Sequence, residues 1–203
     1  QGPAKARNYA LGLHLYDWVA FLDSDDWWES NKIERQLIFS KQNDLDFAWC
    51  NGHNFDKRNK LGQINSFNKI KNNYHIRGGI INRIFGQKNR YAFSFPSASF
   101  YKMQSFKDIN GFNINLKYSN DYDLFVRGYC ENYKLGYLNE KLFNYYVNSN
   151  DQSKMTNQKK QISTQQDDYW SIFLDSYIKK RKPNIYKDFI YTRLSIYNNI
   201  VFN

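Results

Sequence analysis

The sequence predicts an α/β fold built on an open sheet. The clearest indication is in residues 19–28, where an apolar run ends abruptly in the carboxylates of Asp23, Asp25 and Asp26. A short apolar run closed by turn-forming residues is typical of a buried strand that ends at the edge of a sheet. Segments of helical composition precede and follow this strand, as expected of an α/β domain. A chain of 203 residues is long enough for one such domain with a packed core.

The first half of the chain predicts alternating helices and strands. Residues 4–15 follow a Gly-Pro pair and have helical composition, so a helix is expected to lead into the acidic strand. A second helix is expected from near Trp28 and Ser30 to Asn43, where apolar residues recur at helical spacing. Residues 46–51 return to strand character. The polar residues 52–75 predict a hairpin or a long loop over the sheet edge.

The second half predicts shorter elements and a separate tail. In chain order these are a short helix at 80–85, an edge strand or loop at 91–100 around Pro96, a turn at 110–111, a helix at 119–133 and strands at 135–138 and 142–147. Residues 1–150 form the expected domain, residues 151–166 a polar linker and residues 167–203 amphipathic helices broken by Pro183. We expect the apolar stripe of the tail to pack on the domain.

Composition leaves several partners open. The formal net charge of +10 is compatible with nucleic acid, an anionic membrane surface or phosphorylated substrates. The only dense basic run, at residues 179–182, ends an amphipathic segment, where cations are favoured electrostatically, so no nucleic-acid partner is predicted. Peripheral membrane contact and a homo-oligomer stay open. The separated Cys50 and Cys130, the lack of a bilayer-spanning run and the lack of a signal peptide predict a cytoplasmic protein without zinc.

The acidic segment has two interpretations. Asp23, Ser24, Asp25 and Asp26 could form a solvated turn that caps the following helix. Alternatively, carboxylates gathered at the end of a strand are suited to holding a divalent cation together with substrate phosphates. The second interpretation is favoured, because carboxylates this close repel one another unless a cation is present.

Four segments in this order resemble the family 2 inverting glycosyltransferases of the GT-A fold. They are residues 2–8 (Gly-Pro-Ala-Lys-Ala-Arg-Asn), residues 21–26 (Phe-Leu-Asp-Ser-Asp-Asp), residues 111–112 (Gly-Phe) and residues 120–127 (Asn-Asp-Tyr-Asp-Leu-Phe-Val-Arg). Residues 142–149 resemble the closing strand of the family. The resemblance implies a Rossmann-like three-layer sandwich with a mixed central sheet, here lacking the first strands and followed by the helical tail.

The resemblance also implies a role for each site residue. Asp25 would coordinate Mn²⁺ or Mg²⁺, with Asp26 as a second metal candidate, and Asp23 would face the ribose of a nucleotide-sugar donor or help the metal. Arg7 would contact the nucleotide, and Asp121 would deprotonate the acceptor hydroxyl for attack with inversion. The acceptor implied is a saccharide or a lipid-linked sugar at the inner face of a membrane.

Two features depart from the family pattern. Asn120 stands where the family usually has Glu, so the hydrogen bond made by that Glu is expected to be weakened or replaced. The sequence also starts after the strands that recognise the nucleotide base in the family, so part of the donor site is expected to be missing.

Two other functions are compatible with parts of the sequence. A phosphoryl-transfer hydrolase also ends a strand in Asp-x-Asp, with Asp23 as the nucleophile, but Trp27 follows the acids where such enzymes usually have Gly-Thr or Gly-Val. A non-catalytic carbohydrate-binding or nucleic-acid-binding module would use the many aromatic residues and the positive charge. Such a module would bind its ligand in the presence of a chelator, whereas the enzyme would not.

Overall fold

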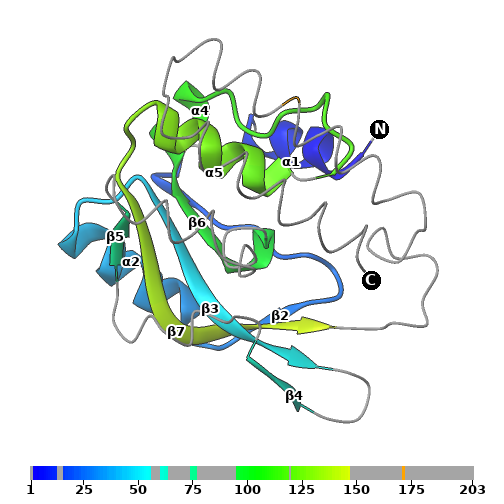
Figure 1. Cartoon of the computed structure of the whole chain (residues 1–203), viewed down its shortest axis with the longest axis vertical. Helices are drawn as coiled ribbons and strands as arrows, with labels where there is room; N and C mark the ends of the chain where they lie inside the picture. The colour runs from blue at the N-terminus through cyan, green and yellow to red at the C-terminus, as the bar shows by residue number, and fades with distance from the viewer. Residues whose placement is uncertain are drawn as a thin grey trace, which may run out of the picture.

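Helices lie on both sides of a curled mixed sheet in this computed structural model (Figure 1). The structure describes residues 2–12, 16–55, 60–63, 74–76, 95–118, 120–146 and Ser171. The expected helix at 80–85 and the expected linker at 151–166 lie outside these residues, and so do the expected helices of 167–203 apart from Ser171.

The helices that were expected around the acidic strand are present. The described helices are α1 (Pro3–Leu11), α2 (Lys32–Gln42), α4 (Met103–Asp108), α5 (Asn120–Cys130) and the short 3₁₀ helix η4 (Pro96–Ala98). Proline occupies the first position of both α1 and η4, where its missing N–H leaves no helical hydrogen bond unmade. Neither α4 nor η4 was predicted, because six and three residues are too few to show a helical period.

The sheet combines parallel and antiparallel pairs. Its described strands are β1 (Trp18–Val19), β2 (Trp27–Trp28), β3 (Phe47–Phe55), β4 (Lys60–Gln63), β5 (Tyr74–Ile76), β6 (Ser99–Lys102) and β7 (Leu135–Tyr146). Their order is β1-β6-β3-β7-β2, with β4 paired to β3 and β5 paired to β7. Among these described strands, only β3 and β7 pair in parallel. The β3–β4 pair forms part of the hairpin that was one alternative for residues 52–75.

Three strands differ from the expectation. The strand β1 is limited to Trp18–Val19 and is only partly buried, whereas the apolar run was expected to form a buried strand that continues up to the acids. Trp27 and Trp28 form β2 against the C-terminal end of β7, although a helix was expected to begin near Trp28. The strand β7 also runs unbroken where two strands were expected. Its polar middle is accommodated because the register with β3 shifts on both sides of Asn51. The differences at β2 and β7 arise from pairing between distant segments, which the local sequence does not reveal.

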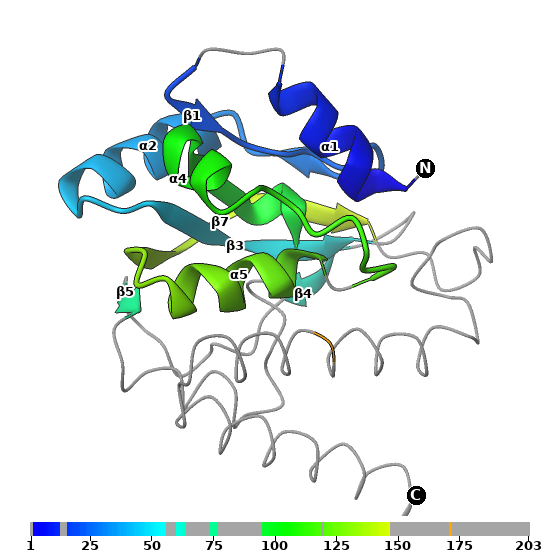
Figure 2. The same ribbon diagram turned by 90° about the horizontal axis from the view of Figure 1, so that it is seen from above.

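Aromatic side chains fill the core on both faces of the sheet. Residues Phe47, Trp49, Tyr101 and Tyr137 face α5, α4 and α1 on one side. On the other side α2 covers a second cluster that includes Phe100 and the neighbouring residues of β3 and β7. Figure 2 shows α2 and α5 on opposite sides of β3. This arrangement puts the start of α5 and the acidic segment at the same end of the sheet.

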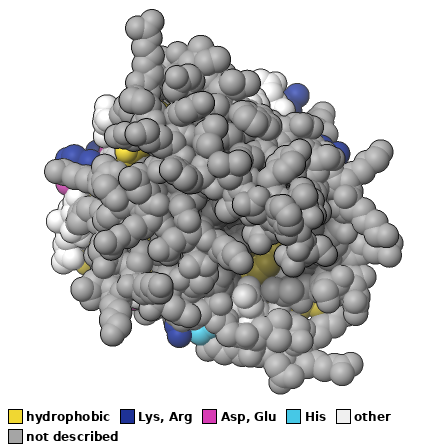
Figure 3. Space-filling model, viewed as in Figure 1, with side chains coloured by type: hydrophobic (Ala, Val, Ile, Leu, Met, Phe, Trp, Pro, Cys, Tyr) yellow, Lys and Arg dark blue, Asp and Glu magenta, His cyan; other side chains and the backbone are white. Residues whose placement is uncertain are grey.

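Charge, helix hydropathy and the two cysteines bear on the partners of the protein. In the view of Figure 3 the described Lys and Arg side chains lie in separate places around the rim. No helix among the described residues has both the length and the apolar character needed to cross a membrane. Cys50 and Cys130 are buried thiols.

Candidate active site

The acidic segment between β1 and β2, residues 20–26, forms a tight loop that we call the acid loop. The amide of Asp26 donates to the carbonyl of Asp23 at 3.1 Å, which closes a turn. The hydroxyl of Ser97, from η4, accepts from the Asp23 amide at 3.1 Å and donates to Asp26 Oδ2 at 2.6 Å. One fully buried serine therefore holds both ends of the turn.

The position of Ser97 is fixed from the other side of the sheet. Side chains from β2 and α2 donate to three successive carbonyls: Trp28 Nε1 to Ser97 at 2.8 Å, Gln36 Nε2 to Ala98 at 3.0 Å and Lys32 Nζ to Ser99 at 3.4 Å. Lys32 is fully buried, which lowers the pKa of its ammonium to about 8, and its Nζ lies 4.2 Å from the centroid of the Trp28 ring. These contacts give hydrogen-bond partners to three successive backbone carbonyls, from η4 to the start of β6.

Both carboxylate oxygens of Asp26, the last acid of the loop, accept hydrogen bonds. Asp26 is buried, and its Oδ1 accepts from the amide of Tyr146 at 3.2 Å while Oδ2 accepts from Ser97. Burial raises the pKa of Asp26 to about 6, the two hydrogen bonds oppose this rise, and the charges of Asp25 and Asp23 add to it. Asp26 therefore ties the acid loop to the end of β7. By contrast, Asp25 is exposed at the tip of the loop.

The first acid of the loop faces α1. The guanidinium of Arg7 forms an ion pair with Asp23 Oδ1, and neither side chain is fully buried. Arg7 Cζ also lies 5.5 Å from the centroid of the Phe112 ring. The arginine is thus held between a carboxylate and an aromatic ring.

The carboxyl of Asp121 lies in the first turn of α5 and is strongly perturbed. Its Oδ1 is buried and has no hydrogen-bond partner in the described part of the chain. Burial raises the pKa of Asp121 to about 7, with Arg7 lowering it and Asp23 raising it further. Tyr101 of β6 is also coupled electrostatically to this carboxyl and to Arg7. A carboxyl that titrates near neutral pH can accept a proton from a substrate hydroxyl.

The neighbouring Asn120 is buried, and its side-chain nitrogen is hydrogen-bonded whereas its side-chain oxygen is not, among the described residues. Its amide donates to the carbonyl of Leu116 at 3.3 Å, whereas its Oδ1 has no partner among the described residues. A carboxylate at this position could not donate that bond. The asparagine therefore anchors the start of α5 without adding a second negative charge beside Asp121.

The predicted site residues gather in two neighbouring groups. Arg7, Asp23 and Asp121 come from three different elements and interact electrostatically, while Asp25 and Asp26 lie in the same loop as Asp23. Among the described residues, no three His, Cys, Asp or Glu side chains are arranged to hold a metal ion on their own. Magnesium and similar ions often bind through one or two carboxylates together with substrate phosphates. The exposed Asp25 fits that mode, whereas both oxygens of Asp26 already accept hydrogen bonds.

Sequence reasoning missed the residues that hold this arrangement. Ser97 and the amide of Tyr146 fix the acid loop, yet neither lies in a recognisable motif. The one local signal is Pro96, which indicates a break in the strand pattern at η4. Asn8 and Phe112 lie in two of the segments that carry the resemblance, but the sequence predicts no role for either.

Comparison with known proteins agrees with the fold and the motifs. The profile described as Glycosyl transferase family 2 matches residues 1–109. The O-antigen biosynthesis glycosyltransferase WbnJ of Escherichia coli is 31% identical over 154 residues, which cover 73% of this chain and 55% of WbnJ. The UDP-Glc:alpha-D-GlcNAc-diphosphoundecaprenol beta-1,3-glucosyltransferase WfgD, also of E. coli, is 31% identical over 99 residues, which cover 47% of this chain and 39% of WfgD.

A solved structure shows the same fold. TarS of S. aureus, residues 1–349, superposes with a TM-score of 0.64 at 16% identity, over 98% of this chain and 53% of that structure. A likeness at this level of identity concerns the α/β fold alone, the GT-A fold of glycosyltransferases. The matches thus span about half the length of WbnJ and of the solved TarS fragment. With a family profile that matches more than half of its residues, the chain belongs to glycosyl transferase family 2.

Proposed function

We propose that this chain carries the catalytic part of an inverting glycosyltransferase, in which Asp121 is the general base and the acid loop holds the metal and diphosphate of a nucleotide-sugar donor. The observation that carries the proposal is the Asp121 carboxyl, with a buried unpartnered oxygen and a pKa of about 7 beside the Arg7–Asp23 pair. General bases work best when their pKa lies near the pH at which they act.

The proposed reaction is a single displacement. The acceptor hydroxyl gives its proton to Asp121, and its oxygen attacks the anomeric carbon of the donor. The bond from that carbon to the diphosphate breaks, and its electron pair leaves with the diphosphate. Attack from the face opposite the leaving group inverts the configuration at the anomeric carbon.

The acid loop serves the donor in this proposal. Asp25 would hold Mn²⁺ or Mg²⁺ at the loop tip, where a bound ion stabilises the negative charge that develops on the diphosphate. Asp23 and Arg7 would contact the ribose and the nucleotide. Asp26 has both oxygens engaged, so we assign it to holding the loop in shape.

The substrates are proposed from the relatives. The name of WfgD gives UDP-glucose as its donor and a diphosphoundecaprenol-linked sugar as its acceptor. A structure of TarS residues 1–349 in complex with UDP-GlcNAc superposes on this chain with a TM-score of 0.60 at 18% identity. We therefore propose a UDP-sugar as the donor and a saccharide, carried on a lipid diphosphate, as the acceptor. Such an acceptor would place the enzyme at the inner face of a membrane.

A donor screen tests the proposal. The complete protein is incubated with Mn²⁺ and a panel of nucleotide sugars, with and without acceptor lipids, and release of nucleoside diphosphate is measured. Release that needs a UDP-sugar and stops with EDTA is the expected result. Donor binding that is indifferent to EDTA, or a covalent phosphate on Asp23, would favour the binding module or the hydrolase instead.

A further inference from the structure

We propose that Asn8, Phe112 and Arg127 are positioning residues that hold the Arg7 guanidinium in the donor site. We call this set, with the turn 109–112 that it fixes, the Phe112 clamp. The donor role of Arg7 rests on the proposed function, whereas the clamp itself is argued from contacts in the structure. None of the three side chains has to touch the substrate.

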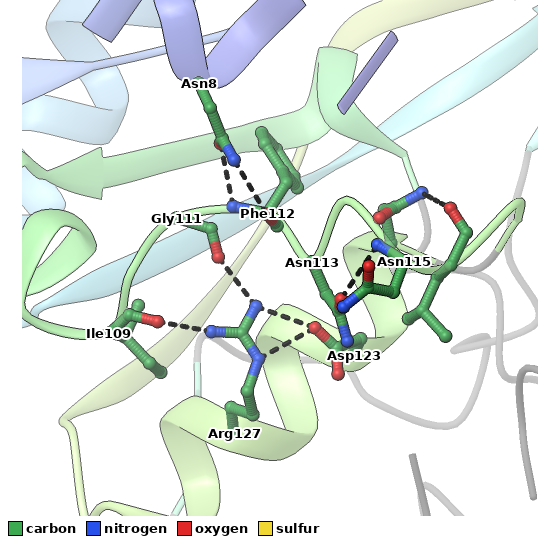
Figure 4. A network of polar contacts seen from close by, with 10 residues as sticks. Asn8, Ile109, Gly111, Phe112, Asn113, Asn115, Asp123 and Arg127 are labelled. Atoms are coloured by element: carbon green, nitrogen blue, oxygen red, sulfur yellow. Dashed lines mark hydrogen bonds and ion pairs between the residues drawn. The ribbon is translucent and has the colours of Figure 1, made fainter. Parts of the chain in front are cut away.

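Asn8 holds Phe112 from α1, at the position directly after Arg7. Asn8 Nδ2 donates to the carbonyl of Phe112 at 2.7 Å, and the amide of Phe112 donates to Asn8 Oδ1 at 2.9 Å (Figure 4). The side-chain amide therefore satisfies both backbone groups of a residue 104 positions away in the sequence. A paired contact of this kind fixes the loop backbone relative to α1 in both distance and orientation.

Arg127 holds the same turn from α5. Its Nη1 donates to the carbonyl of Ile109 at 2.5 Å and its Nη2 to the carbonyl of Gly111 at 2.7 Å. Its Nε donates to Asp123 Oδ2 at 2.7 Å, and Asp123 is only 3% exposed. Figure 4 shows the guanidinium between the turn and the helix. The buried carboxylate therefore orients a planar fork whose other two donors bind the turn.

The turn 109–112 has an unusual backbone conformation that brings its carbonyls and Phe112 to Asn8 and Arg127. Asn110 and Gly111 both have positive φ angles, of 62° and 59°. A Cβ atom at Gly111 would lie 2.7 Å from Asn8 Oδ1, closer than Cβ atoms come to other heavy atoms. Glycine is thus required at position 111 by its backbone angle and by the approach of Asn8.

The clamp reaches Arg7 through the Phe112 ring. This ring is 1% exposed and packs against Phe21 and Phe106, with centroids 5.1 Å and 5.3 Å away. Arg7 lies over the ring and pairs with Asp23 beyond it. A free arginine side chain loses much rotamer entropy when it is ordered, so a fixed ring beneath it lowers the cost of holding it in place. Fixing Phe112 therefore fixes the guanidinium.

A ligand-free measurement tests the geometry. In protein labelled with ¹⁵N-arginine, the Arg7 Nε–H signal is identified by its loss in Arg7→Lys. Phe112→Leu is expected to remove the ring-current shift of this signal, and Asn8→Ala is expected to shift and broaden it. Gln104→Ala removes an exposed side-chain amide bonded to Asp108 on α4 and serves as the matched control with an unchanged signal. Far-UV circular dichroism confirms that each variant is folded.

A binding measurement tests the consequence. UDP with Mn²⁺ is titrated into the complete protein by calorimetry, and donor KM and kcat are measured where transfer is detected. We expect Asn8→Ala and Phe112→Leu to raise the UDP Kd and the donor KM by about tenfold or more, with a smaller change in kcat, because small displacements of a positioning group weaken binding strongly. Gln104→Ala is expected to match the wild type.

The outcomes separate the two proposals. An Arg7 signal that stays unchanged in both folded clamp variants would overturn the clamp. A shifted signal with an unchanged UDP Kd would support the clamp and contradict the donor role of Arg7. A wild-type protein that binds no UDP would contradict the UDP-sugar proposal, and the arginine signal would still decide the clamp.

Discussion

The acid loop and the first turn of α5 differ in the partners that they give to their carboxylates. In the loop, Asp23 is paired with Arg7, and Asp26 accepts from Ser97 and from the Tyr146 amide. At the start of α5, Asp121 keeps a buried oxygen without a partner among the described residues. The hydrogen bonds to Asp26 oppose the rise in pKa that burial causes, whereas the buried oxygen of Asp121 has no such bond in the described part of the chain. The loop is therefore built to keep its shape, and Asp121 is left able to exchange a proton.

The same contrast occurs within α5 itself. Asp123 lies two residues after Asp121 and is buried, yet it is paired with Arg127. The Asp123 carboxylate accepts a hydrogen bond from Arg127 Nε and so orients the guanidinium toward the turn 109–112. A short segment thus carries one carboxylate with a structural partner and one whose buried oxygen has none among the described residues.

The largest effect is expected from Asp121→Asn. Asparagine keeps the shape of the side chain but cannot accept the proton, so kcat should fall by about 10²–10⁴-fold. The UDP-sugar Kd should stay within about twofold of the wild-type value, because the acid loop is untouched. Steady-state turnover and calorimetry measure the two quantities separately. Full transfer activity in Asp121→Asn would show that another group is the base.

The stability of the same variant should change in the opposite direction. Because the pKa of Asp121 is raised by burial to about 7, the folded state binds its proton more tightly than the unfolded state does. Stability from this group is therefore present at low pH and is lost as the pH rises through about 7. Asp121→Asn avoids the buried charge, so its melting temperature at pH 8 should rise by about 2–4 °C, measured by calorimetry.

The second effect is expected from Asp25→Ala. Loss of the exposed carboxylate should weaken Mn²⁺-dependent UDP binding by about 100-fold. Removal of a group in or next to the coordination shell of a metal typically lowers metal affinity by about 10- to 100-fold. EDTA should have the same effect on the wild type and little further effect on the variant. Ser24→Ala, at a neighbouring exposed position of the loop, is the control. Equal UDP affinity of Asp25→Ala and the wild type would remove Asp25 from the metal site.

A smaller effect is expected from Ser97→Ala. Asp26 Oδ2 and the Asp23 amide both lose a partner, which should lower the free energy of unfolding by about 1–3 kcal/mol and reduce turnover by about tenfold. Urea unfolding and UDP release measure these changes. Ser105→Ala breaks a similar serine–aspartate bond, to Asp46 at 2.6 Å, away from the acid loop. Ser105→Ala should lose stability without losing turnover, and a parallel loss in both variants would contradict a specific role for Ser97.

The smallest effect is expected from Arg35→Ala. Arg35 and Glu140 form an exposed ion pair outside both regions of the comparison. Surface pairs of this kind contribute little because water and salt screen them. Neither the melting temperature nor the turnover should change measurably. A clear loss of turnover would mean that the site extends to this side of the sheet.

The residues of the acid loop and of α5 could be predicted from the sequence because each lies in a contiguous pattern. The apolar run before Asp23 and the periodic segment after Asn120 carry their own local signal. The predicted helix at 119–133 is confirmed as Asn120–Cys130, and the strand at 46–51 is confirmed within Phe47–Phe55.

The supports of the site could not be predicted in this way. Ser97 lies 71 positions from Asp26, and Asn8 lies 104 positions from Phe112. A serine hydroxyl or an asparagine amide has no periodicity, and its partner becomes apparent only when the sheet brings distant segments together. The same reason explains why β2 was missed, since Trp27 and Trp28 become a strand only through β7.

The pH dependence of transfer tests the role of Asp121 most directly. We would measure kcat/KM for UDP release by the wild type from pH 5 to 9, and the UDP Kd over the same range. With Asp121 as a base of pKa about 7, log kcat/KM should fall by about one for each pH unit below 7, while the UDP Kd changes little. A profile that is flat between pH 5 and 8 would contradict the assignment of Asp121 as the base.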